Sequence, residues 1–438
     1  MLAVGAVAIA TGVAKGAPGH TVIFSDRWTT CMRVSRKRRW RVEVSDSVET
    51  FADAWAALVT PFNSSLFQAY GLMRLFYAEL AANRLAEPVI ALVRQADGQP
   101  AALFPMMRSR RNGLNWLHTD ARPLDYSAPV FAADLSPGEI REIIASVLQA
   151  VPRADLLYCN KMPAAFLGVA NPLIALPNAG RLRFSAWTLP LAGRPEAELL
   201  AARQSRFRSS LRSRKQKMAA SHRRDFVMRI GSEISLQDFA EFRSLRSQGF
   251  EEKNRSDILD DPNWINFYTQ LSQNEARHIT PWLSLLRADG ELIAVLFGFM
   301  EGDRPVAIMP GSKMGEWKSH TPGLQLFDET ISWFHARNAR YLDLSIGDMT
   351  YKQRFGCEEI ALHDALFPAT IIGRLYYIFW RVKVKIRSKL NPVSESFSIN
   401  QVLTDLVTSL LTMLHLPRIR SSNAERGRHD NGAKQDRD

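Results

Sequence analysis

The chain has few cysteines and none of the short signatures that identify the best-known enzyme classes. Only Cys31, Cys159 and Cys357 occur among 438 residues, with no CxxC pair and no histidine at metal-ligand spacing. This scarcity argues against a disulfide framework or a metal site and favours a reducing compartment. The sequence also lacks GxSxG, a Walker A loop, GxGxxG after a strand, and HExxH.

The apolar run at the start of the chain lacks the order of a secretion signal. Residues 1–14 are small and apolar, but the basic run lies after them, between Arg33 and Arg41. A signal peptide has its basic residues first. We therefore expect residues 1–39 to be an extension that is disordered or a mis-assigned start. We expect a cytoplasmic protein, which in one interpretation lies peripherally at the inner membrane face.

Negative charge is in the minority. The chain has 56 Lys and Arg against 44 Asp and Glu, a net charge of +12. Such a balance favours anionic partners, including coenzyme A, RNA, anionic polysaccharide and lipid headgroups. No DNA-reading motif accompanies the charge, so we do not expect DNA as a partner. The length allows two domains of ordinary size.

Two similar hairpin signals divide the chain. Asp97-Gly98 and Asp289-Gly290 each separate two apolar runs, in the passages VRQADGQPAALFPMM (93–107) and LRADGELIAVLFGFM (286–300). An Asp-Gly pair between apolar runs is the strongest short hairpin signal. Helical sequence precedes each passage, and another turn and strand follow it. We interpret the pattern as an internal duplication, in preference to two unrelated hairpins.

A strongly basic helix is predicted between the two halves, over residues 196–224. Its apolar residues share one helical face: Leu200, Phe207, Leu211 and Met218. Arg208, Arg212 and Lys215 follow another face. Such a helix is either a solvated linker between domains or an anion-binding surface.

Residues 320–356 hold the densest group of candidate functional residues. A helix is predicted over 322–338, with Pro322 in its first turn, and a strand over 340–345. Around that strand lie two carboxylates and a Tyr-Lys pair: Asp343, Asp348, Tyr351 and Lys352. A helix start with free amides beside these groups is a plausible anion site.

This region resembles the C-terminal half of the GNAT-type domain of CelD-like cellulose-biosynthesis proteins and related FemAB-like acyltransferases. The resemblance is carried by Thr321-Pro322-Gly323, Trp333, Tyr341, Asp343, Gly347, Asp348, Tyr351, Lys352, Phe355 and Gly356. The basic helix, with Arg206, Arg212 and Lys215, and the Asp125-Tyr126 pair are also similar to that group. The loop before the helix has a single glycine, unlike the usual GNAT pyrophosphate loop.

The resemblance implies an α/β (α+β) fold of two tandem GNAT-like domains, each a mixed, mostly antiparallel sheet flanked by helices. We expect these domains over residues 40–190 and 191–367. A tail over 368–438 would hold two apolar, amphipathic helices and a disordered end. In the first, Ile371, Leu375, Ile378, Val382 and Ile386 line one side, which would suit either packing on the protein or an anionic membrane surface.

The resemblance also implies an acyltransferase that uses acetyl-CoA or another acyl-CoA and needs no metal. Its acceptor would be a small-molecule or saccharide amine or hydroxyl. Tyr351, Lys352, Asp343 and Asp348 are the expected catalytic residues. Tyr351 would protonate the leaving thiolate, Lys352 would hold an anion or the oxyanion, and an aspartate would orient or deprotonate the acceptor. The expected donor-binding residues are Lys318, Thr321, Gly323, Leu324 and Arg212.

Two other functions remain open. A Fem-like enzyme would use aminoacyl-tRNA, and the basic helix favours this reading. A non-catalytic GNAT-fold scaffold would dock on a membrane polysaccharide synthase or on lipid, and the altered donor loop favours that one.

Overall fold

The computed structural model describes residues 39–389, except 253, 274–275, 277 and 348–349. For residues 383–389 it describes the backbone only. The predictions for the N-terminal extension and for the second helix of the tail lie outside the described residues.

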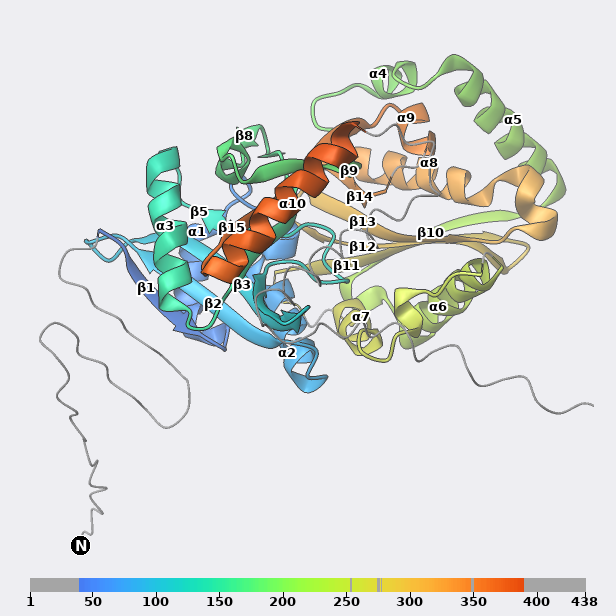
Figure 1. Cartoon of the computed structure of the whole chain (residues 1–438). Coiled ribbons are helices and arrows are strands. Elements are labelled where there is room, and N and C mark those ends of the chain that lie inside the picture. The colour runs from blue at the N-terminus through green and yellow to red at the C-terminus, as the bar shows by residue number, and fades with distance from the viewer. Residues whose placement is uncertain (1–38, 253, 274–275, 277, 348–349, 390–438) are drawn as a thin grey trace, which may run out of the picture.

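The two halves of the chain repeat one order of elements, which confirms the predicted duplication (Figure 1). Each half has a strand, two helices, a three-stranded antiparallel meander, a helix and two further strands. The first-half elements are β1 (Arg41–Ser45), α1 (Ala52–Leu58), α2 (Tyr70–Ala82), β2 (Glu87–Arg94), β3 (Pro100–Arg111), β4 (Leu114–His118), α3 (Pro137–Ala150), β6 (Leu156–Pro163) and β9 (Ala179–Pro190).

The second half adds a short helix, α9, between its last two strands. Its elements are β10 (Arg224–Ile230), α6 (Leu236–Glu251), α7 (Ile265–Ser272), β11 (Thr280–Ala288), β12 (Glu291–Glu301), β13 (Arg304–Ser312), α8 (Pro322–His335), β14 (Tyr341–Ile346), α9 (Thr350–Arg354) and β15 (Glu358–Pro368). The predicted basic helix is two helices, α4 (Glu196–Ala201) and α5 (Ser205–Ser221), and α10 (Ile371–Lys389) follows β15.

The Asp-Gly hairpins form where the sequence predicts them. Gly98 and Gly290 have φ of 88° and 87° at the β2–β3 and β11–β12 turns, and Asp289 has φ of 50°. Glycine adopts this left-handed region without the steric penalty of a Cβ, so it suits a tight hairpin. The local turn chemistry therefore sets the register of both meanders.

The main strands form one mixed sheet, in the order β1-β2-β3-β4-β6-β15-β9-β14-β13-β12-β11-β10. Most neighbours are antiparallel, whereas β4 with β6 and β13 with β14 are parallel. Each parallel pair follows a meander and is joined by a helix, α3 or α8. This arrangement confirms the predicted mixed, mostly antiparallel sheets.

The last strands of the two halves are interleaved in the middle of the sheet. β15 lies between β6 and β9, and β9 lies between β15 and β14. Each half therefore completes its sheet with a strand from the other. The predicted boundary between residues 190 and 191 falls at the end of β9, whose hydrogen bonds join both halves.

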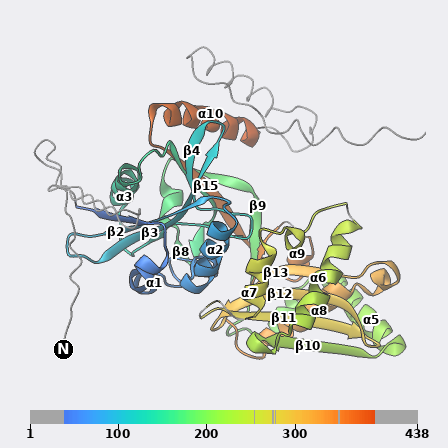
Figure 2. The same cartoon turned by 90° about the horizontal axis from the view of Figure 1, so that it is seen from below.

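Helices cover both faces of the sheet (Figures 1 and 2). In the second half, α8 packs on one face and α6 and α7 on the other. The α6–α7 side shares a core with α1 and α2 of the first half. Phe76 and Trp264 stack there with ring centroids 5.7 Å apart. This shared core fixes the two halves against each other.

Candidate functional site

A small network of ion pairs ties α5 to α8. Asp328 on α8 pairs with Arg203, just before α5, and with Lys215 on α5. Glu329 lies 2.9 Å from Lys215 Nζ and 2.8 Å from a guanidinium nitrogen of Arg224. The Arg203 side chain is only 6% exposed, so the charge of Asp328 offsets its lost hydration. The network holds the basic helix over α8.

Helix α8 begins without a side-chain cap. Thr321 occupies the N-cap with a left-handed φ of 50°, and Pro322 takes the first helical position. The buried hydroxyl oxygen of Thr321 has no hydrogen-bond partner within the described residues. Strained backbone of this kind clusters at ligand sites, and an uncapped helix start attracts anions through its amides and dipole.

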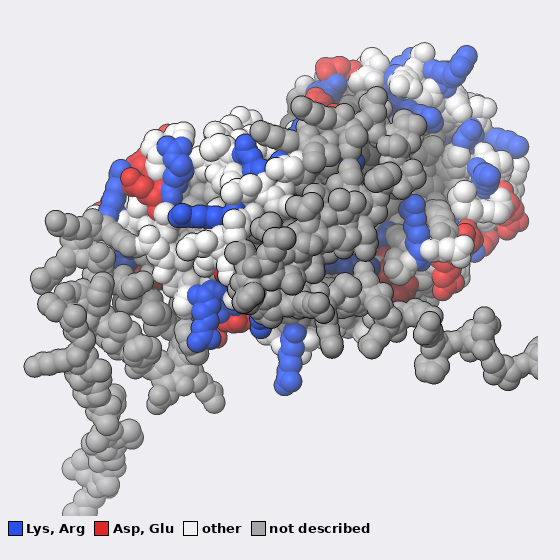
Figure 3. Space-filling model, viewed as in Figure 1, with Lys and Arg blue, Asp and Glu red and all other residues white. Residues whose placement is uncertain are grey.

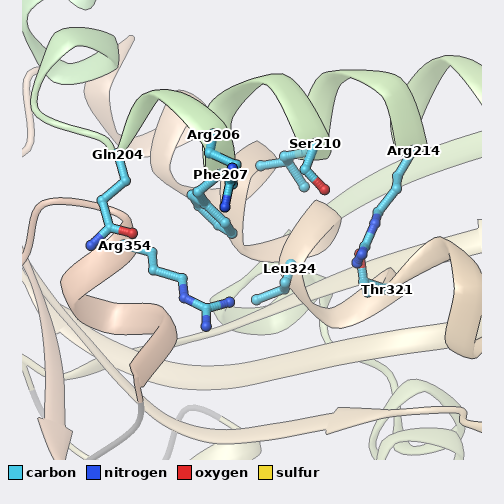
Figure 4. A pocket seen from close by; sticks show the side chains of 9 residues that line it. Gln204, Arg206, Phe207, Ser210, Arg214, Thr321, Leu324 and Arg354 are labelled. Carbon is cyan, nitrogen blue, oxygen red and sulfur yellow. The ribbon is translucent and has the colours of Figure 1, made fainter.

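A pocket of about 300 Å³ lies between α5, the start of α8, and α9 (Figure 4). Arg206 and Arg214 reach it from α5, and Arg354 from α9. Thr321 and Leu324 of α8 form its opposite wall, and Arg214 extends toward Thr321. The remaining lining residues are Gln204, Phe207, Ser210 and Leu211.

The pocket lining carries three guanidinium groups and no carboxylate. Guanidinium groups bind phosphate through paired, charge-assisted hydrogen bonds. Further Lys and Arg side chains stand on the surface around α5, at the upper right of Figure 3. This pocket, which we call the arginine pocket, therefore suits a phosphate-bearing ligand.

A second polar group lies on the other face of the sheet, at the end of β14. Leu342 and Leu344 pack in the apolar cluster under α8. Asp343 and Ser345 instead bond to the first half of the chain. The Tyr126 hydroxyl donates to Asp343 Oδ1 at 2.8 Å, and the Ser345 hydroxyl donates to Asp125.

Hydrogen bonds from Lys161 hold the loop that carries Asp125 and Tyr126. The Lys161 ammonium donates to the carbonyl oxygens of Ala121 and Leu124, at 3.1 and 2.7 Å. On the β14 side, the Ser345 backbone N–H donates to Asp343 Oδ1 at 2.7 Å. We call Asp125, Tyr126, Asp343 and Ser345 the junction cluster. The cluster contains residues from both halves of the chain, and the hydrogen bonds above hold them in place.

Burial changes the acidity of both carboxyl groups. It raises the pKa of Asp343 to about 6, although the hydrogen bonds from Ser345 and Tyr126 act in the opposite direction. Burial also raises the pKa of Asp125, and the hydrogen bond from Ser345 lowers it. A carboxyl group that titrates near neutrality can accept a proton and release it again. Asp343 is therefore a candidate general base.

Strands β13 and β14 diverge between the arginine pocket and the junction cluster. They pair at a single position, Val306 with Asp343. Beyond it, β13 runs to Ser312 beside the start of α8, and β14 runs to Ile346 before α9. A Cβ added to Gly323 would stand 3.3 Å from the Ser312 side chain, which shows how closely α8 starts against β13.

Residues 205–353, which include α5, α8 and β14, match the family model of the acetyltransferase (GNAT) domain. This match identifies a GNAT-type domain within the second half of the chain. No curated protein matches its sequence.

Solved structures resemble this chain over both halves. FemX matches with a TM-score of 0.51 and 10% identity, over 76% of this chain and 98% of its own. A conserved protein of unknown function from Bacteroides thetaiotaomicron matches with a TM-score of 0.47 and 12% identity, over 74% of this chain and 98% of its own. A tandem GNAT protein from the clavulanic acid biosynthesis pathway matches with a TM-score of 0.43 and 10% identity, over 75% of this chain and 99% of its own. The likeness to FemX is one of fold, and the predicted FemAB-like architecture is confirmed.

The GNAT domain brings only part of the predicted donor site together. Thr321 and Leu324 line the arginine pocket, and Gly323 lies beside them at the start of α8. Lys318 and Arg212 are exposed and do not line it. Arg212 lies on the solvent side of α5, and Lys318 lies in the turn Gly315–His320 before the helix.

The sequence-based prediction of donor residues did not include Arg214 or Arg354. Arg206, Ser210 and Arg214 step by four along α5, so they share the face that also holds Phe207 and Leu211. This spacing was a readable signal. Arg354 gave no such signal, because its position depends on how α9 packs.

The predicted catalytic residues Lys352 and Tyr351 both lie on α9, in different surroundings. Lys352 is buried, and its ammonium donates to the carbonyl oxygens of Leu344, Ser345 and Ile346 at 3.0, 3.3 and 3.3 Å. It fixes the end of β14 and does not line the arginine pocket. Tyr351 packs edge-on against Phe327, and burial raises its pKa to about 12. Asp348 lies outside the described residues.

No helix in the described part of the chain is both long enough and apolar enough to cross a bilayer. Within the described residues, no three His, Cys, Asp or Glu side chains gather as a possible metal site.

Proposed function

We propose that this protein transfers an acyl group from acyl-CoA to an amine or hydroxyl acceptor. The observation that carries the proposal is the arginine pocket, which opens at the start of α8 on the side of β13 and β14 opposite Asp343. The two strands diverge beyond their single pair at Asp343. A phosphate-bearing donor held in the pocket could thus direct its acyl end between the strands toward the junction cluster.

The residues of the pocket fit the phosphates of coenzyme A. Arg206, Arg214 and Arg354 supply positive charge and paired donors. Thr321 has a buried hydroxyl oxygen without a partner in the described chain, at the uncapped start of α8. The donor brings an activated thioester, and these residues bind and orient it.

Asp343 is the proposed general base. Its carboxylate would accept the proton of the acceptor amine or hydroxyl as that atom forms its bond to the acyl carbon. The bond from the acyl carbon to sulfur breaks, and Tyr351 would protonate the leaving thiolate. Burial keeps Tyr351 protonated near neutral pH, as an acid must be. Lys352 acts by holding the end of β14, and Asp348 remains a proposed residue of the same site.

The acceptor would approach from the face of the sheet that carries the junction cluster. Asp125 and Tyr126 bring the first half into contact with Asp343 and Ser345 there. We propose a small-molecule or saccharide acceptor, as in cell-envelope or polysaccharide biosynthesis, and a cytoplasmic site of action where acyl-CoA is formed.

Calorimetric titration of the full chain with acetyl-CoA tests the donor. We expect saturable heat at or below millimolar ligand, and acetyl transfer to at least one member of a panel of amines and sugars. No heat at millimolar acetyl-CoA, together with no transfer, would count against this function.

A Fem-like reaction with aminoacyl-tRNA is the second candidate. Arg208 and Arg212 are exposed on α5 beside the arginine pocket, and an extended basic surface suits an RNA backbone better than it suits one nucleotide. Retention of charged tRNA at physiological salt without binding of coenzyme A would select this donor.

A scaffold that has lost catalysis is the third candidate, and the single glycine in residues 318–323 favours it. A protein that binds neither donor and transfers no acyl group, yet associates with a polysaccharide synthase, would support this role.

A further inference from the structure

Helix α10 has two apolar sides, and only one of them is used within the described structure. Trp116 and Leu366 of the sheet pack against its inner side. That side is rich in aromatic residues, and the Tyr376 ring meets Trp116 edge-on with centroids 5.2 Å apart. The other inner residues are Ile372, Tyr377 and Trp380. This contact anchors the helix to β4, β6 and β15.

The outer side of α10 is the apolar stripe that the sequence predicts. Ile371, Leu375, Ile378 and Val382 step by four, three and four, and their exposed fractions are 77, 39, 60 and 46%. The other large apolar residues that are exposed in the described chain belong to separate elements or loops: Phe62, Leu85, Val169, Leu236 and Met314. Contiguous exposed apolar surface of this kind marks an interaction site.

The charge of α10 identifies the kind of partner. The sequence of Ile371–Lys389 contains six basic residues, Arg374, Arg381, Lys383, Lys385, Arg387 and Lys389, and no acidic residue. Arg374 is exposed beside the stripe. Arg381 donates to the carbonyl oxygen of Pro177, which holds it near the protein. Near the start of the helix, the Asp155 carboxylate accepts hydrogen bonds from the Thr370 hydroxyl and from the backbone N–H of Asn115.

An apolar stripe on a purely basic helix is the pattern of a helix that lies in the interface of an anionic bilayer. A globular protein partner would need an apolar groove flanked by several carboxylates. An anionic bilayer offers an apolar interior and negatively charged headgroups along its whole surface. Since α10 is too charged to cross the bilayer, it would lie along the surface. Its aromatic inner side would keep it attached to the sheet.

We propose that the outer side of α10 docks the protein on anionic lipid headgroups, with Ile371, Leu375, Ile378 and Val382 entering the interface. This inference is independent of the transfer reaction. It places the arginine pocket and the junction cluster on a protein held at a membrane surface.

Flotation of the full chain with vesicles tests the proposal. We expect binding to vesicles that contain phosphatidylglycerol, much weaker binding to pure phosphatidylcholine, and weaker binding at higher salt. Ile378→Glu should lower the partition coefficient at least about tenfold, because it removes apolar area and adds negative charge at the headgroups. Leu236→Glu is the matched control, because Leu236 is 64% exposed on α6, and it should bind as the unaltered protein does.

Three outcomes would overturn the proposal. The unaltered protein could fail to bind anionic vesicles, as it would if its own residues 390–438 covered the stripe. Ile378→Glu could bind as well as Leu236→Glu. Sedimentation without lipid could show a dimer that Ile378→Glu dissociates, which would assign the stripe to a second copy of the chain. Circular dichroism of both variants checks that each is folded.

Discussion

The Tyr126 hydroxyl donates a hydrogen bond of 2.8 Å to Asp343 Oδ1, although the two residues are 217 positions apart in the chain. Tyr126 follows β4 in the first half, and Asp343 lies on β14 in the second. The hydrogen bond reaches the carboxyl group that we propose as the base. The first half therefore contributes directly to the setting of that base.

Replacing Asp343 tests the base. Asp343→Asn keeps an acceptor for Tyr126 but cannot take up a proton, so the turnover number should fall by about 10²- to 10⁴-fold. In the unaltered protein, kcat/KM should rise with pH and level off above about 6, because the base acts when ionised and burial raises its pKa to about 6. The inflection should disappear in the variant. An unchanged pH profile would remove Asp343 from the reaction.

The same carboxyl group should make stability depend on pH. Its folded-state pKa is raised, so the proton binds more tightly in the folded protein, and the stabilisation is complete below the unfolded pKa near 4. It is lost as pH rises toward about 6, by about 2–3 kcal/mol. Asp343→Asn should therefore gain stability relative to the unaltered protein between pH 4 and pH 8, as measured by urea unfolding. A difference that is constant with pH would contradict this.

Tyr126→Phe should move the pH profile without abolishing activity. The hydrogen bond from Tyr126 stabilises ionised Asp343, so its loss raises the pKa of that carboxyl and shifts the inflection of kcat/KM to higher pH. Tyr77→Phe is the matched control, since the buried Tyr77 hydroxyl donates to the Met106 carbonyl oxygen at 2.9 Å. It should lower stability by a similar amount and leave the inflection in place. If both variants shift it equally, the effect is general and not specific to Asp343.

Comparing variants of two arginines on opposite sides of α5 distinguishes binding in the arginine pocket from a general effect of positive charge. Arg214→Ala should weaken acetyl-CoA binding about tenfold or more, because a charge-assisted contact contributes about 1.5–3 kcal/mol. Arg212→Ala removes the same charge from the same helix but outside the pocket, and should change the affinity little. Calorimetry on both variants gives the comparison. Equal losses would point to a diffuse electrostatic effect, as expected for tRNA.

Removing Asp328 should destabilise the domain strongly. Asp328→Ala leaves the Arg203 guanidinium buried without its carboxylate partner, which costs about 3–5 kcal/mol in comparable cases. Glu198→Ala removes the partner of Arg194 in an exposed pair, and there the change should be small. Urea unfolding followed by circular dichroism measures both. A loss for Asp328→Ala no larger than that for Glu198→Ala would show that α5 is not held by this network.

Lys352→Met should report a positioning role. The substitution leaves three carbonyl oxygens at the end of β14 without this donor, so we expect a loss of about 2–4 kcal/mol in unfolding free energy. The exposed Lys217 provides a control, Lys217→Met, that should cost little. If Lys352→Met lost turnover with no loss of stability, the ammonium would act on the substrate instead.

Local patterns in the sequence predicted the elements well. The Asp-Gly turns, the Pro322 helix start and the apolar periodicity each depend on residues within one or two turns of chain. The stripe on α10 was visible for the same reason. The sequence did not show which side of α10 packs against the sheet, because Tyr376, Tyr377 and Trp380 form an equally apolar opposite side. Only packing decides which side meets the sheet.

The amino-acid sequence by itself determined the repeated order of elements, the hairpins, the helix start at Pro322 and the basic character of α5. The tertiary structure alone decided that Arg214 and Arg354 line one pocket with Thr321, that Lys352 turns inward to the carbonyls of β14, and that Asp343 accepts from Tyr126. The contact of Asp343 with Tyr126 joins residues 217 positions apart, from the two halves of the chain. The two halves also interleave β9 with β15, and no local periodicity encodes such pairing.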